Sequence, residues 1–182
     1  GASVLYSPAA LVVDTQGRIL VTDSWLHTIV VFDWEGVCLS RMGYCGVEQG
    51  HFQKPLGLAL GRNDDIYIAD CGNHRIQVLT KDGKFLREFG GQGVTAGRFD
   101  EPQSVTVDAV RGLVAVAERG NTRVQIFDEY GQCLKILKNF RWARDDIIGQ
   151  ELVVDQSGTV EELGLPVCVC FDPAKGLLFM TD

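Results

Sequence analysis

The sequence predicts an all-β protein built as a β-propeller, because one pattern of short strands recurs along the chain. Four prolines open the copies; the first three stand 47 residues apart and the fourth follows 64 residues later, at Pro8, Pro55, Pro102 and Pro166. Each complete copy holds four short segments rich in β-branched residues, separated by polar or glycine-containing turns. Four antiparallel strands in a repeat of about 45 residues are typical of one propeller blade.

The strands within each copy follow in order from its proline. A short alternating strand comes first and leads into a tight turn. The second strands each end on a carboxylate, at Ile19–Asp23, Ile66–Asp70, Val114–Glu118 and Leu178–Asp182. The third strands follow a short polar loop, at Thr28–Phe32, Arg75–Leu79 and Arg123–Phe127. A glycine-containing turn then leads into a fourth strand, as at Phe85–Phe89.

The repeat divides residues 1–182 into three complete blades and the start of a fourth. The blades are predicted at about 8–43, 55–90, 102–137 and, in part, 166–182, with an insertion at 138–165. Helix is expected to be almost absent. Because the fourth copy holds only two strands, we expect a fragment of a larger ring; closure through a strand borrowed from residues 4–6 would still leave that blade incomplete.

The sequence of the middle copy matches the pattern of a known repeat family. It combines Ile66-Tyr67-Ile68-Ala69-Asp70 with Asn73-His74-Arg75-Ile76-Gln77-Val78, then Asp82-Gly83 and Phe89-Gly90, and it resembles an NHL repeat almost throughout. The flanking copies match less closely, with Leu26-His27-Thr28 and Asn121-Thr122-Arg123 at the central triplet. The resemblance implies a six-bladed propeller, often the C-terminal domain of tripartite-motif or other RING-type E3 ubiquitin ligases. The chain itself has no RING pattern.

Composition narrows the class of protein. The apolar stretches have strand length, far below the roughly 20 residues that cross a bilayer, so no membrane partner is expected. The net charge of -7 disfavours general phosphate binding. The six cysteines do not form a disulfide pattern, which favours reduced thiols and a cytoplasmic protein. Cys38 and Cys133 correspond to Phe85 and are predicted to be small core residues, while Cys168 and Cys170 share one side of a strand.

Catalysis is not expected of this domain. His27 and His74 occupy equivalent repeat positions, and His51 lies in a connection matched by Gly97-Arg98-Phe99, so each histidine follows the repeat. A catalytic site is normally asymmetric. Asp23, Asp70 and Glu118 allow an acid–base interpretation with Arg75 or Arg123, but repetition in each blade favours a structural ion pair or a cap on loop N–H groups. No cofactor, metal or small-molecule substrate is expected.

A binding role is therefore predicted, on the face formed by the second-to-third loops and the blade connections. A protein partner is expected first. Single-stranded RNA is the alternative, because the resemblance includes RNA-binding propellers and arginines recur on this face. For Trp25, packing between blades is the alternative to partner binding. For Trp142, the alternative is packing against a blade edge. The candidate partner-binding residues are Trp25, His27, His74, Arg75, Arg119, Arg123, Arg141, Trp142 and Arg144.

Overall fold

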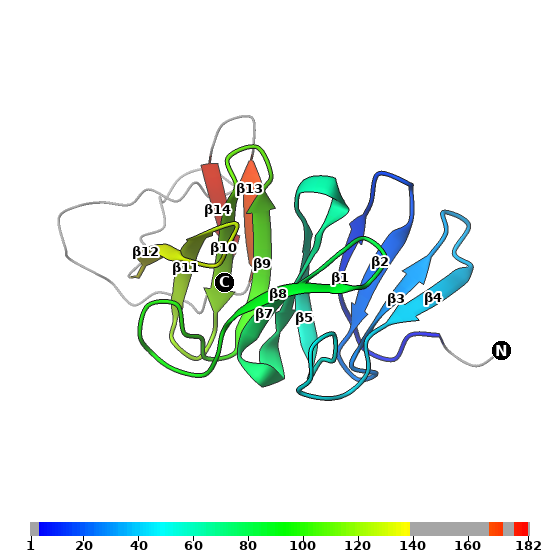
Figure 1. The fold of residues 1–182 in the computed structure, drawn as a ribbon, viewed down its shortest axis with the longest axis horizontal. Helices are drawn as coiled ribbons and strands as arrows, with labels where there is room; N and C mark the ends of the chain where they lie inside the picture. Colours follow the sequence, from blue (N-terminus) through cyan, green and yellow to red (C-terminus); the bar gives the residue numbers. More distant parts are fainter. Residues whose placement is uncertain (1–3, 139–167, 173–176, 182) are drawn as a thin grey trace.

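The computed structural model describes residues 4–138, 168–172 and 177–181, which form separate antiparallel sheets (Figure 1). The first sheet contains β1 (Pro8–Val13), β2 (Ile19–Asp23), β3 (Thr28–Phe32) and β4 (Cys38–Met42). The second contains β5 (Pro55–Leu60), β6 (Ile66–Asp70), β7 (Arg75–Leu79) and β8 (Phe85–Gly90). The third contains β9 (Pro102–Asp108), β10 (Leu113–Glu118), β11 (Arg123–Asp128) and β12 (Cys133–Leu137).

Two further strands, β13 (Cys168–Asp172) and β14 (Leu177–Thr181), pair as the start of a fourth blade. In each four-stranded sheet the strands are hydrogen-bonded in sequence order. The helical segments in the described residues are two 3₁₀ turns, η1 (Arg62–Asp64) and η2 (Cys71–Asn73). Three complete blades, two strands of a fourth and little helix are thus confirmed. None of the described residues belongs to a helix long and apolar enough to cross a membrane.

The first strands of successive blades lie side by side at the centre of the assembly. β1 contacts β5, β5 contacts β9, and β9 contacts β13. Figure 1 shows the sheets following one another with their faces opposed. The approach is close at Gly57, where an added Cβ would lie 2.8 Å from the Gln103 carbonyl oxygen, so this position has no room for a side chain.

The hydrophobic core lies between the blades and not within one sheet. Strand alternation sends one set of side chains toward the preceding blade and the other toward the next. Between the first two blades, Leu20, Ile29 and Val31 pack against Ile66 and Ile68, all essentially inaccessible. A second cluster joins blades two and three, and a third joins blade three to β13 and β14. Each blade therefore depends on its neighbours for burial.

The prediction for Cys38 was wrong, and the packing direction explains why. Phe85 packs on the cluster shared with the first blade, and Cys133 packs on the cluster shared with the second. Cys38 takes the same repeat position but is exposed, because the described residues include no blade that packs against that side of the first sheet. All six cysteines are free. Burial raises the pKa of the Cys71 thiol to about 11.

Candidate partner-binding face

Loops from all three blades gather at one end of the sheets. Each fourth strand runs antiparallel to the third, so the connection to the next blade begins beside the second-to-third loop, as Met42 opposite Ile29 shows. We call this end the loop face; its connections lie at the lower edge of Figure 1. It is made of residues 4–7, 24–27, 43–54, 71–74, 91–101 and 119–122.

A buried carboxylate organises the loop face in the second blade. Asp70, fully inaccessible, accepts hydrogen bonds from the Gln53 N–H (2.7 Å), the Asn73 amide (2.8 Å), Arg75 Nε (2.8 Å) and Gln77 Nε2 (3.2 Å). These donors come from the preceding connection, the loop and the third strand. The carboxylate therefore joins three chain segments at one point.

The third blade repeats this network with a longer acid. Glu118 accepts from the Asp100 N–H at 3.1 Å, from Arg123 Nε at 2.6 Å and from Gln125 Nε2 at 2.7 Å. The side chain of Asn121 completes the set, as Asn73 does in the second blade. The structural interpretation of these carboxylates is thereby confirmed.

Arg75 and Arg123 continue the network into the connections between blades. Arg75 Nη2 donates to the carbonyl oxygens of Glu48 and His51, both at 3.0 Å. Arg123, whose side chain is 1% exposed, donates to the carbonyl oxygens at positions 94, 95 and 98. Because a guanidinium has a fixed set of donors, these bonds hold each connection in one shape.

In the first blade, the buried carboxylate accepts hydrogen bonds from different donors. Thr28 and Val30 stand where Arg75 and Gln77 stand in the second blade, so Asp23 lacks these donors. The buried Asp23 instead accepts backbone N–H groups, from Tyr6 and Ser7 before the blade and from Trp25 and Leu26 in its loop. Burial raises the pKa of Asp23, but these hydrogen bonds outweigh burial and leave it below its usual value.

Stability is expected to fall on acidification. The pKa values of Asp14 and Asp108 are also lowered, because hydrogen bonds from Arg18 and Arg111 outweigh the opposing effect of burial. A lowered folded-state pKa contributes stability above the unfolded-state value, and this contribution is lost as pH falls through the folded-state pKa. Urea unfolding should therefore show a falling free energy of unfolding below about pH 4. Replacing Asp14, Asp23 and Asp108 by asparagine should flatten that slope; an unchanged slope would contradict the assignment.

Two histidines connect neighbouring blades at equivalent positions. His27 Nδ1 accepts the N–H of Lys54 at 2.8 Å, and His74 Nδ1 accepts the N–H of Glu101 at 3.2 Å. Both residues have positive φ, 55° and 53°. The equivalence predicted for the two histidines is thus confirmed, and each bond ties a loop to the entry of the next blade.

His74→Asn is expected to be tolerated better than His74→Val. Asparagine accepts the left-handed conformation and offers an acceptor, whereas valine is β-branched and offers none. We expect thermal denaturation to place His74→Val below His74→Asn by about 1 kcal/mol or more. Equal stabilities would show that neither the conformation nor the bond to Glu101 matters.

The predicted partner-binding residues have different surroundings on the loop face. Trp25 is 72% exposed, so it does not pack between blades. Arg119 is also exposed, with Nη1 3.8 Å from Glu101. His27 and His74 are half-buried, Arg75 is mostly buried and Arg123 is buried within its blade. Arg141, Trp142 and Arg144 lie outside the described residues.

Sequence reasoning missed several exposed side chains on the same face. The only sequence signal for these side chains is an apolar or aromatic residue within an otherwise polar connection. Two cations, Lys54 and Arg98, are also exposed on this face. The missed apolar residues, with their exposed fractions, are Tyr6 (61%), Tyr44 (74%), Val47 (65%) and Val94 (73%).

A separate central groove lies between the first strands of the blades. It has a volume of about 290 Å³ and is lined by small or neutral side chains, among them Ala10, Gly57, Ser104 and Cys168. Among the described residues, no group of three or more His, Cys, Asp or Glu side chains is placed to hold a metal ion.

The blades, their central strands and the repeated carboxylate network define a β-propeller. The NHL repeat family matches residues 5–32, 52–79 and 99–127, one match in each complete blade. The chain is therefore an NHL-repeat propeller carrying three such repeats. No curated protein matches the sequence significantly.

Solved structures share the fold at low sequence identity. Hydrazine synthase from Kuenenia stuttgartiensis gives a TM-score of 0.66 at 11% identity, over 99% of this chain and 43% of that one. A chain of a nidogen–laminin complex gives 0.63 at 18% identity, over 96% and 56%. Virginiamycin B lyase from Staphylococcus aureus gives 0.59 at 19% identity, over 96% and 62%. The chain thus spans about half the length of the structures it resembles.

Proposed function

We propose that this propeller is a non-catalytic module that binds a protein partner on its loop face. The observation that carries the proposal is the exposure of Trp25, Tyr44, Val47 and Val94 on one face. Large apolar side chains on a surface are characteristic of interfaces, and aromatic residues supply many interface hot spots. A chain of a nidogen–laminin complex among the similar structures is consistent with such a role.

The loop face is also held rigidly, which favours binding because little conformational entropy is lost in ordering the loops. Phe52 and Phe99 are inaccessible and anchor the two connections from below. Their backbone groups bond across each connection, from the Phe52 N–H to Tyr44 O at 2.8 Å and from the Phe99 N–H to Gly91 O at 2.9 Å. The exposed side chains between these anchors are thus presented in fixed positions.

Single-stranded RNA is the second candidate. Lys54, Arg98 and Arg119 are exposed on this face, which also carries exposed aromatic rings of the kind on which bases stack. The case is weaker than for protein, because Arg75 and Arg123 are committed to internal hydrogen bonds. A salt titration separates the two: RNA affinity falls steeply between roughly 50 and 200 mM salt, in proportion to phosphate contacts.

We further propose that the propeller belongs to a ubiquitin-ligase-related protein that acts in the cytoplasm, as the NHL resemblance implies. The propeller would recruit the partner to that protein. The full-length reading frame tests this proposal directly. A RING and B-box encoded upstream of residue 1 support it, whereas a secretory signal peptide would contradict the cytoplasmic assignment.

Replacing Trp25 and Tyr44 together by alanine is expected to weaken partner binding at least about tenfold, because both rings are exposed and anchor-like. Proteins cross-linked to the tagged wild type in cells would be quantified for the variant. Tyr130→Ala is the matched control, since Tyr130 is 76% exposed but lies in the turn between β11 and β12, at the opposite end. Equal loss in the control, or none in the double variant, would contradict the assignment of the loop face.

The insertion provides an independent test at residues outside the described ranges. Arg141→Ala, Trp142→Ala and Arg144→Ala combined are expected to reduce partner binding while leaving the fold intact, because arginines beside an aromatic ring suit an interface anchor. Normal folding with unchanged binding of protein and RNA partners would exclude this segment.

A further inference from the structure

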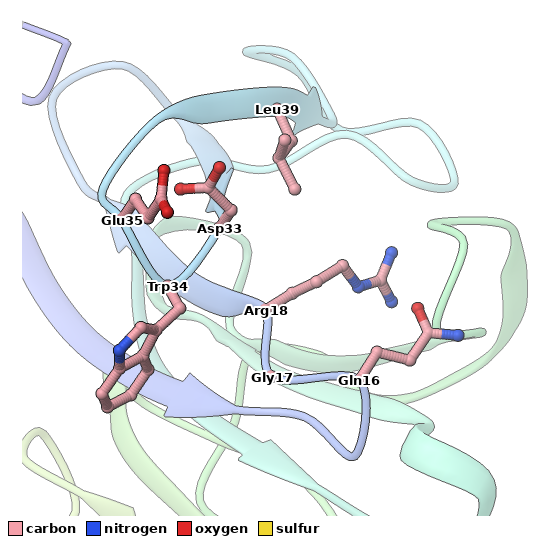
Figure 2. Close-up of a pocket in the computed structure, with 7 residues that line it drawn as sticks. All are labelled: Gln16, Gly17, Arg18, Asp33, Trp34, Glu35 and Leu39. Carbon is pink, nitrogen blue, oxygen red and sulfur yellow. The ribbon is translucent and has the colours of Figure 1, made fainter.

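The groove in Figure 2 lies between the turns of the first blade and has a volume of about 620 Å³. In the third blade, the corresponding turns are bound by a side chain from the blade before it, because Arg62 Nε donates to Ala109 O at 2.7 Å. Arg18 Nη2 binds the second blade in the same way, donating to Lys81 O at 3.0 Å. A blade that precedes the first one would cover this groove likewise, so the groove indicates no separate ligand.

The two junctions between complete blades each depend on a histidine. At the first junction, His27 Nδ1 accepts the N–H of Lys54 at 2.8 Å, and at the second, His74 Nδ1 accepts the N–H of Glu101 at 3.2 Å. A backbone N–H only donates, so each Nδ1 must be unprotonated for the bond to form. Protonation of either ring would replace the acceptor with a second donor. Both bonds therefore require a neutral imidazole, the side chain that ordinarily changes charge between about pH 5 and 8.

The two junctions differ at the residue before the bonded N–H, which is Gln53 at the first and Asp100 at the second. These two side chains occupy equivalent places. A Cβ added at Gly72 would lie 2.9 Å from Gln53 Cγ, and one added at Gly120 would meet the carboxyl group of Asp100. Asp100 Oδ1 lies 3.4 Å from His74 Nδ1. The second junction thus has a carboxylate beside its histidine where the first has a neutral amide residue.

Protonation is expected to affect the two junctions differently. At the second junction, the new Nδ1–H of His74 would face the carboxylate of Asp100, so a charge-assisted hydrogen bond replaces the backbone bond that is lost. At the first junction, the charged ring of His27 would face the backbone N–H of Lys54, a residue whose exposed side chain is itself a cation. Like charges and opposed donors repel, so the first junction loses its bond without an ionic replacement.

The other ionisable groups at the junctions do not supply the missing acceptor. The buried carboxylates of Asp23 and Asp70 already accept backbone N–H groups, from positions 25 and 26 and from position 53. Burial raises the pKa of the Cys71 thiol to about 11, so this thiol stays neutral between about pH 5 and 8. At the second junction, the buried carboxylate of the third blade accepts the N–H of position 100, and Arg119 Nη1 lies 3.8 Å from Glu101 Oε2.

We propose that His27 is a pH-dependent latch between the first two blades, closed while its imidazole is neutral and released when the ring is protonated. The loop at 24–27 carries the exposed Trp25, and the connection that the latch holds carries the exposed Tyr44 and Val47. Release therefore loosens the aromatic part of the loop face as the pH falls from about 7.5 to about 5.5. The second junction stays closed over the same range through Asp100.

NMR of the whole chain without a partner tests the latch separately from the proposed partner binding. The amide proton resonance of Lys54 is expected to move with the same midpoint pH as the Cε1–H resonance of His27. The backbone order parameters of Trp25 and Lys54 should fall from about 0.85 at the higher pH to below about 0.6 at the lower, whereas those of Gly72 and Glu101 should stay near about 0.85. Constant order parameters at Trp25 and Lys54, or an equal fall at both junctions, would overturn the proposal.

Exchanging the residue that distinguishes the junctions makes the test specific. Gln53→Asp gives His27 a neighbouring carboxylate and is expected to keep the first junction ordered at the lower pH. Asp100→Asn is the reciprocal variant and should make the order parameter of Glu101 fall. His27→Asn keeps an acceptor and tolerates the left-handed conformation but does not titrate, so the first junction should lose its pH response. An undiminished response in His27→Asn, or no change of response in either exchange variant, would overturn the latch.

Discussion

Arg123→Leu is expected to lower the free energy of unfolding by about 3–5 kcal/mol, because it leaves the carboxylate of Glu118 buried without its cation. Both side chains are essentially inaccessible, and Nε lies 2.6 Å from Oε1. The substitution also leaves the carbonyl oxygens of Val94, Thr95 and Arg98 without their shared donor. Such a loss is a large part of the roughly 5–15 kcal/mol that stabilises a typical domain.

Urea denaturation of Arg123→Leu, Arg123→Lys and Arg119→Ala would measure this effect. Lysine keeps the charge but loses the planar set of donors, so we expect an intermediate loss. Arg119→Ala is the control on the same loop; its guanidinium is exposed and 3.8 Å from Glu101, so the change should be within about 0.5 kcal/mol. If Arg123→Leu were as stable as the control, the network would not hold the third blade.

The strands were predictable because each blade repeats the same local signals. Alternating apolar residues, a proline at the start and a turn glycine fix each strand, and predicted second strands such as Ile19–Asp23 and Ile66–Asp70 agree with the structure residue for residue. The third strand of the third blade extends one residue beyond the prediction, to Asp128. Strand ends depend on hydrogen bonds that periodicity does not encode.

Burial across blades was less predictable than the strands. Arg123 has the sequence context of a loop cation, yet carbonyl oxygens from a connection about 25 residues earlier surround it. Cys38 and Phe85 share a repeat position, but among the described residues a neighbouring blade packs against Phe85 and none packs against Cys38. The pattern Asn-x-Arg-x-Gln after a carboxylate, at 73–77 and 121–125, is the sequence signal that could have indicated the network.

Phe99→Ala is expected to destabilise the protein by about 3–5 kcal/mol, the usual result of emptying a large core site. Phe99 is inaccessible and packs with Phe89 and Phe127, at ring-centroid distances of 6.3 and 5.4 Å. It also fills the space beneath Gly90, where an added Cβ would lie 2.4 Å from the ring. Removing the ring therefore leaves a cavity shared by blades two and three and loosens the connection above it.

Two measurements separate the global effect from the local one. Chemical denaturation should place Phe99→Ala well below Tyr130→Ala, the control in which a 76% exposed ring is removed at little cost. Hydrogen exchange should show the Gly93 amide losing protection, because its N–H donates to the Phe99 carbonyl oxygen at 2.9 Å across the connection. Because Val94 and Arg98 lie on that connection, partner binding should weaken as well. Unchanged protection at Gly93 with normal stability would show that the connection is held by Arg123 alone.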